Sequence, residues 1–290
     1  MPDTVPFRRI AVIGTGLIGG SFALAVRKYF PEIQIRGWDR DAAVVDRAAV
    51  RGAIHGAFGD IPAAVTDADL VYIALPVSAI TKVLAPIAAS APAHALVTDA
   101  GSTKVLIARA AKECFKDDSR FLGGHPMAGK ETSGIDHADA ELFRGAPYAL
   151  IANETTAPAA VRDFARLITA IGAQPVWCDA ETHDWSVSVV SHLPQLLAIA
   201  LAQVVNDETD ETGLPASLAG SGLRDTVRLA GSPHTVWRDI CLTNSENISR
   251  ALDRMSQAID YLRANLKNRE LEDEFASANA LYKILRSKHE

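Results

Sequence analysis

Residues 10–21 decide the fold of the amino-terminal half and have the sequence Ile10-Ala11-Val12-Ile13-Gly14-Thr15-Gly16-Leu17-Ile18-Gly19-Gly20-Ser21. The first four residues form a short apolar run, which is typical of a parallel strand that is buried on both faces. A helix is expected over residues 22–29, directly after the glycines. The order of strand, Gly-x-Gly-x-x-Gly loop and helix predicts the first unit of a doubly wound α/β sheet.

Each glycine of this loop has an expected role in binding a dinucleotide. Gly14 allows a tight turn, Gly16 lets the backbone approach a pyrophosphate, and Gly19 allows the helix to pack closely. The amino terminus of the helix then faces the anion, so Leu17 and Ile18 are counted among the cofactor-binding residues. The alternative is a glycine turn without a ligand.

The cofactor type is indicated by the residues that follow a second expected strand, residues 33–38. Asp39 lies about 20 residues beyond the last glycine of the motif, where an acid is expected to bind the ribose hydroxyls. This favours NAD over NADP. Arg40 could hold a 2′-phosphate instead, but Asp39 would repel that phosphate directly.

Further strands are expected to continue the same sheet and to bring several loops to one crevice. Leu75 and Pro76 end one strand at the cofactor crevice, and Ser102 and Thr103 precede a helix that starts at Val105. Both hydroxyl residues are N-cap candidates for that helix, and a cap near the crevice can also contact a ligand. The expected strands are residues 69–76, 94–98, 120–122, 147–151 and 174–178, with a helix over residues 157–171.

The stretch Gly123-Gly124-His125-Pro126-Met127-Ala128-Gly129-Lys130-Glu131 follows the sixth expected strand and places a histidine at the carboxyl edge of the sheet. A histidine titrates near neutrality, so His125 can accept a proton from a reacting hydroxyl. The glycines before it suit a strand that turns into a loop. The alternative is a loop histidine whose hydrogen bonds are simply satisfied.

After Asp179 almost every segment predicts helix, so the domain boundary is placed between residues 1–178 and 179–290. A long helix is expected over residues 182–207, with an apolar stripe and a polar strip beside it. The strip holds His192 with Ser188 and Gln195, and Pro194 is expected to open the helix locally. Such a strip is either structural or a ligand surface.

Two arginines and a second apolar stripe occupy the rest of the helical half. Arg224 and Arg228 are four residues apart and project from one helical face. A guanidinium is suited to hold a carboxylate with two hydrogen bonds, whereas the alternative for Arg224 is a solvated face. A stripe of apolar side chains is either core or a subunit contact: Ile248, Leu252, Met255, Ile259 and Leu262.

Composition excludes several classes of protein. Apolar residues make up 48% of the 290 residues and charged residues 22%, which suffices for ordinary globular cores. The net charge of −6 and the interspersed basic residues argue against nucleic acid as a partner. Three separated cysteines argue against a disulfide framework or a metal site, and they fit a reducing cytoplasm. The apolar run after Arg9 is too short for a signal or membrane segment.

The motifs taken together resemble the prephenate dehydrogenases of tyrosine biosynthesis. The resemblance covers most of the chain in the right order. It is carried by the glycine motif and by Asp99-Ala100-Gly101-Ser102-Thr103-Lys104, Gly124-His125-Pro126-Met127-Ala128-Gly129-Lys130-Glu131, Ser191-His192-Leu193-Pro194, and Arg224-Asp225-Thr226-Val227-Arg228 through Trp237-Arg238-Asp239.

The resemblance implies an NAD-dependent oxidative decarboxylation by a homodimer that associates through its helical half. It implies that His125 takes the proton of the substrate ring hydroxyl and that Ser102 fixes that hydroxyl. It also implies that Arg228 clamps a substrate carboxylate. The remaining implied substrate-binding residues are His192, Gln195, Glu131, Trp237 and Gly222.

Two positions depart from the family pattern and leave the substrate open. Many members have histidine where Gln195 stands, and a Gly-Gly pair where Ser221-Gly222 stands. Arogenate, with an amino acid side chain in place of the keto acid of prephenate, is therefore an alternative substrate. Two rival hypotheses are an NAD(P)-dependent β-hydroxyacid or imine reductase and a nucleotide-sensing protein without catalysis.

Overall fold

The computed structural model describes residues 5–209, 213–268 and 271–287. Eight strands form one sheet in the order β3-β2-β1-β4-β5-β6-β7-β8. The strands are β1 Arg9–Ile13, β2 Gln34–Trp38, β3 Gly56–Ala57, β4 Leu70–Ile73, β5 Leu96–Asp99, β6 Phe121–Pro126, β7 Pro147–Ile151 and β8 Gln174–Cys178. The first six strands are parallel, and their order is that of a dinucleotide-binding sheet with its crevice between β1 and β4.

Helices cover both faces of the sheet, because alternate residues of each central strand point to opposite faces. Ile10 and Val12 of β1 pack with Phe22 on one face, whereas Ala11 and Ile13 pack with Ile80 on the other. The helices of this half are α1 Leu17–Tyr29, α2 Ala42–Val50, α3 Ile61–Val65, α4 Val77–Ser90, α5 Val105–Cys114 and α6 Ala159–Ala170. The 3-10 turns are η1 Asp118–Arg120, η2 Ile135–His137 and η3 Glu154–Thr156.

The last two strands differ from the parallel sheet that the sequence predicts. β7 runs antiparallel to β6, and β8 runs parallel to β7. The chain reaches β7 through residues 127–146, all of which are described and which contain the turn η2 but no α-helix. Two neighbouring parallel strands need a crossover connection, which is usually a helix. The helix α6 supplies such a connection between β7 and β8, but no α-helix within the described residues 127–146 connects β6 to β7. The doubly wound fold is confirmed, with two reversed strands at one edge.

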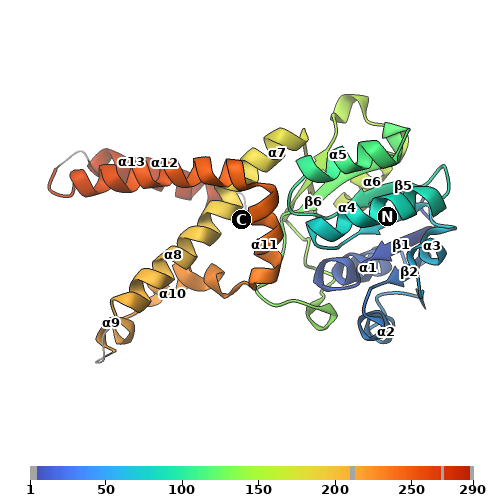
Figure 1. The fold of residues 1–290 in the computed structure, drawn as a ribbon, viewed down its shortest axis with the longest axis horizontal. Coiled ribbons are helices and arrows are strands. Elements are labelled where there is room, and N and C mark those ends of the chain that lie inside the picture. The colour runs from blue at the N-terminus through green and yellow to red at the C-terminus, as the bar shows by residue number, and fades with distance from the viewer. Residues whose placement is uncertain (1–4, 210–212, 269–270, 288–290) are drawn as a thin grey trace.

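The second half is helical, as expected from the sequence. Figure 1 shows α7 and α11 next to the sheet, whereas α8 and α12 extend away from it in diverging directions. The elements are α7 Ala180–Val187, the π-helical segment η4 Ser188–His192, α8 Leu193–Asp207, α9 Leu214–Ser217, α10 Ser221–Val227, the 3-10 turn η5 Arg228–Gly231, α11 His234–Thr243, α12 Ser245–Ala264 and α13 Leu271–Ser287.

The continuous helical stretch Ala180–Asp207 is long and apolar enough to cross a membrane by length and composition alone. It nevertheless carries His183 and Asp184 buried at its start, and it packs against α10, η5 and α12. These contacts identify it as the central helix of the second half.

Large apolar side chains remain exposed along the helices that extend from the sheet. Within the predicted stripe of α12, Ile248 is buried, whereas Ile259 is 50% exposed. α13 exposes more of the same kind: Phe275, Leu281, Tyr282, Ile284 and Leu285. Exposed apolar surface of this extent is typical of a protein contact, and the distal part of the stripe is not part of the core of this chain.

Candidate functional site

The glycine-rich loop after β1 has the geometry that a dinucleotide pyrophosphate requires. Gly14 has a φ of 93°, and a Cβ there would clash with the backbone of Ala74. Gly19 lies so close to the carbonyl oxygen of Gly14 that a Cβ would overlap it, so α1 can pack closely on the loop. A Cβ on Gly16 would meet no atom within 4 Å. The loop is therefore tight at two glycines and open at the third.

The amino terminus of α1 is free to bind an anion. The helix begins at Leu17, five residues earlier than the sequence predicts, and its cap residue Gly16 offers no side chain. Leu17 and Ile18 therefore form the first turn, whose backbone N–H groups lack intrahelical partners. Within the described residues, the space above Gly16 is open and the first-turn N–H groups have no side-chain cap. This arrangement fits the pyrophosphate of a dinucleotide.

Asp39 lies beside this loop, directly after β2. Its Oδ2 accepts a hydrogen bond from the Thr15 N–H at 3.0 Å, and its Oδ1 accepts one from the Asp41 N–H at 3.2 Å. A carboxylate has about four acceptor sites, so two remain for ribose hydroxyls. Arg40 is exposed next to it.

The other predicted crevice residues lie at the carboxyl ends of β4 and β5. Leu75 is close to Gly14, and Pro76 is the cap of α4. Ser102 and Thr103 do not cap α5, contrary to the sequence interpretation, because α5 starts at Val105 after Lys104 and has no local side-chain cap. The Ser102 hydroxyl makes no hydrogen bond within the described residues, which leaves it available to a ligand.

His125 is part of β6 rather than of the following loop, as Gly124 and His125 pair with Leu150 and Ala149 of β7. The side chain is 9% exposed. Its Nδ1 lies 2.9 Å from Nε2 of His183, with the two rings edge to face.

The electrostatic surroundings of His125 favour the neutral ring. Burial is the largest reason that the pKa of His125 lies well below its usual value of 6.5. Three basic groups lower it further: His183, Lys104 and His192. A ring that stays neutral can act as a proton acceptor over the whole physiological range of pH.

Asp184 of α7 joins the two halves of the chain at this point. Its Oδ1 accepts hydrogen bonds from the Lys104 N–H at 2.7 Å and lies 2.8 Å from Nδ1 of His183. Its Oδ2 accepts one from the Val105 N–H at 3.0 Å. The cap of α5 therefore comes from a residue about 80 positions away, which explains why no local serine or threonine is needed.

A buried ion pair supports the strand that carries His125. The Lys104 ammonium contacts the Asp99 carboxylate and donates to the carbonyl of Gly124 at 2.7 Å. Lys104 is 1% exposed and Asp99 is fully buried. Burial lowers the pKa of Lys104, and the attraction of Asp99 opposes that shift.

His192 is buried at the end of the π-helical segment that precedes Pro194. Its Nδ1 lies 3.2 Å from the Asn244 amide nitrogen, which also donates to the carbonyl oxygen of Asp184 at 2.7 Å. Trp237 of α11 packs edge to face on its ring, with centroids 5.9 Å apart. Burial lowers the pKa of His192 to about 4. The predicted opening of the helix near Pro194 is thus a π turn.

The polar strip of the long helix is its buried side. Ser188, His192 and Gln195 are all 1% exposed or less, whereas in the expected apolar stripe only Leu193 is buried and Val204 is 58% exposed. Gln195 donates to the carbonyl of Leu229 at 2.9 Å and so holds η5 against α8.

Arg228 begins η5 and forms an ion pair with Glu131 from the loop after β6. Both side chains are exposed, at 61% and 42%. The guanidinium of Arg228, in the helical half, therefore contacts the loop that follows His125. Gly222 lies in the exposed first turn of α10, and no described contact links it to the histidine cluster.

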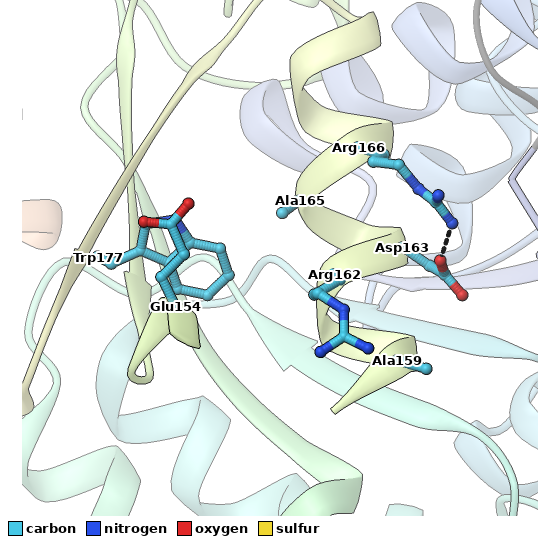
Figure 2. Close-up of a pocket in the computed structure, with 7 residues that line it drawn as sticks. All are labelled: Glu154, Ala159, Arg162, Asp163, Ala165, Arg166 and Trp177. Atoms are coloured by element: carbon cyan, nitrogen blue, oxygen red, sulfur yellow. Dashed lines mark hydrogen bonds and ion pairs between the residues drawn. The ribbon is translucent and has the colours of Figure 1, made fainter. Parts of the chain in front are cut away.

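Two cavities of the described chain contain none of the predicted site residues. The larger has a volume of about 410 Å³ and lies between α6 and the edge strand β8, where Arg166 pairs with Asp163 and Trp177 faces the helix (Figure 2). The other, of about 310 Å³, lies beside α5.

Sequence reasoning missed His183, Asp184, Lys104 and Asn244. The nine residues from His183 to His192 turn an ideal α-helix by about 900°, which places the two rings on opposite faces. The wider turn of the π-helical segment changes this phase, and both rings come to lie near His125. The adjacent His-Asp pair at the start of an apolar helix was the signal available in the sequence.

Family models and known proteins agree on the class of protein to which this chain is similar. A model described as prephenate dehydrogenase, nucleotide-binding domain, matches residues 22–177, and one described as prephenate dehydrogenase, dimerization domain, matches residues 179–281. The chain is 34% identical over 267 residues to the prephenate dehydrogenase of Bacillus subtilis, covering 92% of this chain and 72% of that protein. It is 31% identical to the cyclohexadienyl dehydrogenase of Zymomonas mobilis, covering 91% and 90%.

A solved structure shares the fold over nearly the whole chain. The prephenate dehydrogenase of Aquifex aeolicus, in complex with hydroxyphenyl propionate and NAD+, superimposes with a TM-score of 0.86 at 26% identity. The match covers 99% of this chain and all of that one.

Proposed function

The chain belongs to the prephenate dehydrogenase family, and from this premise we propose that it oxidatively decarboxylates prephenate to 4-hydroxyphenylpyruvate in tyrosine biosynthesis, with NAD as the oxidant. It is an oxidoreductase with a nucleotide-binding half. The observation that carries the proposal is His125, a buried ring at the carboxyl edge of the sheet whose low pKa keeps it neutral.

NAD fits the residues around the first crevice. Gly14, Gly16 and Gly19 leave an open cradle for the pyrophosphate, and Asp39 keeps two acceptor sites for ribose hydroxyls. The acid also disfavours a 2′-phosphate beside it, although Arg40 is adjacent. NAD+ supplies the hydride acceptor when bound, and the Aquifex aeolicus relative holds NAD+ in its structure.

Within this reaction His125 removes a single proton. The substrate carbon that loses hydride carries a hydroxyl, and loss of carbon dioxide makes the ring aromatic. The protein must therefore orient the substrate and accept the hydroxyl proton, which the Nε2 of His125 does while the Ser102 hydroxyl fixes the same oxygen. The lack of a hydrogen bond at Ser102 within the described residues supports this role.

The substrate carboxylate is assigned to Arg228. Because Glu131 already pairs with this guanidinium, a bound carboxylate must displace Glu131 or share the arginine with it. His192 and Trp237 are assigned to the same substrate site, because His192 lies near His125 and Trp237 packs on the His192 ring. Gln195 positions η5, from which Arg228 projects. Gly222 is assigned to the substrate site on the family resemblance alone.

Several finer assignments belong to the same proposal. The nucleotide-binding part covers residues 1–178 and the substrate-binding part 179–290, which is supported by the ranges of the two family models. The exposed apolar faces of α12 and α13 support a homodimer. We assign the enzyme to the cytoplasm, where its nucleotide and reduced thiols fit.

Arogenate is the second candidate substrate. Gln195 stands where many relatives have histidine, and a glutamine amide can donate to a carboxylate or accept from an ammonium. The similarity to a cyclohexadienyl dehydrogenase favours testing both substrates.

The test is a side-by-side assay of prephenate and arogenate, each with NAD+ and NADP+, following reduced nicotinamide. We expect turnover of prephenate with NAD+. Binding of NAD+ without turnover of either substrate would support the nucleotide-sensing alternative, and turnover of β-hydroxyacids alone would support the reductase alternative.

Two variants separate the assigned roles. His125→Asn should lower kcat by about 10²- to 10⁴-fold because it removes the proton acceptor. Arg228→Ala should raise KM roughly tenfold or more, since a hydrogen bond to a charged group contributes about 1.5–3 kcal/mol. Arg224→Ala is the matched control, because Arg224 is exposed and, among the described residues, donates only to the carbonyl of Ala219. A reversed pattern would mean that the two roles are misassigned.

A further inference from the structure

Three buried side chains form a continuous hydrogen-bonded chain that ends at the proposed base. Nδ1 of His125 lies 2.9 Å from Nε2 of His183, and Nδ1 of His183 lies 2.8 Å from Oδ1 of Asp184. The exposed fractions are 9%, 3% and 1% in the same order. Of these three residues, only His125 has a role in the reaction proposed for this enzyme.

The positions of the protons in this hydrogen-bonded series follow from Asp184, at the end farthest from His125. Asp184 accepts one backbone hydrogen bond at each carboxyl oxygen, from the N–H groups of Lys104 and Val105, so its Oδ1 faces Nδ1 of His183 as an acceptor. Nδ1 of His183 must then carry the proton that faces Oδ1. In a neutral ring this leaves Nε2 of His183 as an acceptor.

The same logic sets the tautomer of His125. Because Nε2 of His183 is an acceptor, Nδ1 of His125 must donate to it. The lone pair of His125 is then on Nε2, which makes no hydrogen bond within residues 5–209, 213–268 and 271–287. Only this tautomer can accept a proton from a substrate hydroxyl at Nε2.

We propose that His183 and Asp184 are positioning residues that hold His125 in the Nδ1–H tautomer and receive the catalytic proton from it. The inference rests on the proposed function. As the bond between the substrate hydroxyl oxygen and its proton breaks, that proton binds Nε2 of His125. The Nδ1 proton of His125 then moves to Nε2 of His183, and His183 becomes an imidazolium beside the Asp184 carboxylate. His125 is neutral again, and no other reactant is needed.

The charges around the two rings favour this destination. The groups that face the pair are Lys104 with Asp99 from the β5–α5 region, His192 from η4 and Asp184 from α7. Lys104 donates to the carbonyl of Gly124, directly before His125, so a positive charge on His125 is opposed. A positive charge on His183 instead directly contacts a carboxylate in a medium of low dielectric constant.

The experiment compares two substitutions of His183 that differ in one property. In His183→Gln the side-chain oxygen can still accept from Nδ1 of His125, but it cannot hold the proton. His183→Leu can do neither. His55→Gln is the matched control, because His55 also accepts through a ring nitrogen, from the Ile35 N–H, but lies beside β2 and β3 at the far edge of the sheet.

For His183→Gln we expect kcat to fall by about 10- to 100-fold, a part of the 10²–10⁴ that a general base contributes, with KM within about threefold of wild type. The kcat–pH profile should also differ from that of the wild type, because the proton can no longer pass from His125 to His183. The double variant His125→Asn/His183→Gln should be no slower than His125→Asn alone. His55→Gln should keep the wild-type kcat and pH profile.

A second measurement reports the tautomer without relying on turnover. Ring nitrogens of ¹⁵N-labelled protein, observed by NMR, should show Nδ1 of His125 protonated in the wild type and in His183→Gln. In His183→Leu the other tautomer should appear. Thermal melting of each variant identifies loss of folding.

The relay is overturned if His125 is Nε2-protonated in the wild type, if His183→Leu leaves the tautomer unchanged, or if the rate losses of the two single variants multiply. If wild-type protein turns over neither prephenate nor arogenate, the proposed function fails, and the NMR result still decides whether His183 sets the tautomer of His125.

Discussion

Lowering the pH should destabilise this protein through His192 in particular, and replacing that residue with asparagine should remove the effect. The His192 ring is 1% exposed, and burial lowers its pKa from 6.5 to about 4. An asparagine oxygen occupies about the place of Nδ1, so it can still accept from the Asn244 amide, but it does not titrate. The substitution therefore separates the charge from the hydrogen bond.

The sign and size follow from linkage between protonation and folding. The unfolded chain binds a proton near pH 6.5 and the folded chain only near pH 4, so the stability contributed by a neutral His192 is present above pH 6.5 and is lost as the pH falls. At about 1.4 kcal/mol for each pKa unit, the full loss is roughly 3 kcal/mol, of which about 2 kcal/mol is reached at pH 5.

The assay is urea unfolding at pH 8 and pH 5 at one fixed protein concentration, since association would shift the apparent stability. At pH 8, His192→Asn should be about 1–2 kcal/mol less stable than wild type, because it loses the edge-to-face contact with Trp237. Between pH 8 and pH 5 it should lose about 2 kcal/mol less than wild type does.

An exposed histidine provides the control for this measurement. His137→Asn should lose as much stability between the two pH values as wild type, because the His137 side chain is exposed. If His192→Asn and wild type lose equal stability within about 0.5 kcal/mol, the buried neutral ring is not the cause and the reasoning fails.

Three further predictions concern the glycine-rich loop after β1, the contact between the two halves, and the ion pair between Glu131 and Arg228. Gly16→Ala should keep the wild-type melting temperature, because the added Cβ meets no atom within 4 Å. It should weaken NAD+ binding at least tenfold in a titration, because the Cβ fills the space for the pyrophosphate. Gly19→Ala should instead destabilise the fold by several kcal/mol in calorimetry, because its Cβ overlaps a backbone oxygen. Asp239→Ala removes the carboxylate that accepts a hydrogen bond from the Ser78 N–H, in the first turn of α4, at 2.9 Å. Urea unfolding should show that the free energy of unfolding falls by about 1 kcal/mol, whereas Asp239→Asn should lower it less. Glu131→Gln should change the free energy of unfolding by less than about 1 kcal/mol, because the ion pair of Glu131 with Arg228 is exposed. It should lower KM for the substrate, because Glu131 no longer competes for the guanidinium. An unchanged KM would show that the carboxylates of Glu131 and of the substrate do not compete for Arg228.

The sequence alone determined the sheet and the cofactor loop, because both depend on local patterns. Apolar runs of four to six residues specify strands that are buried on both faces, and the spacing of Gly14, Gly16 and Gly19 specifies the turn between the first strand and its helix. His125 was identified for the same reason, since it follows a strand whose carboxyl end lies at the crevice. The reversed direction of β7 was missed, because strand direction depends on the path of a connection and not on the composition of the strand.

The surroundings of His125 depend on contacts between segments that are distant in the sequence. The contacts of His183 and Asp184 join positions 58 and about 80 residues apart, and the sequence carries no period that relates them. From hydrophobic periodicity, the polar strip of the helix over residues 182–207 was placed at the edge of the core face. In the folded protein this strip is buried, because its side chains find hydrogen-bond partners there. A polar group is placed by the partners that satisfy it, and those partners come from elements that meet only when the chain is folded.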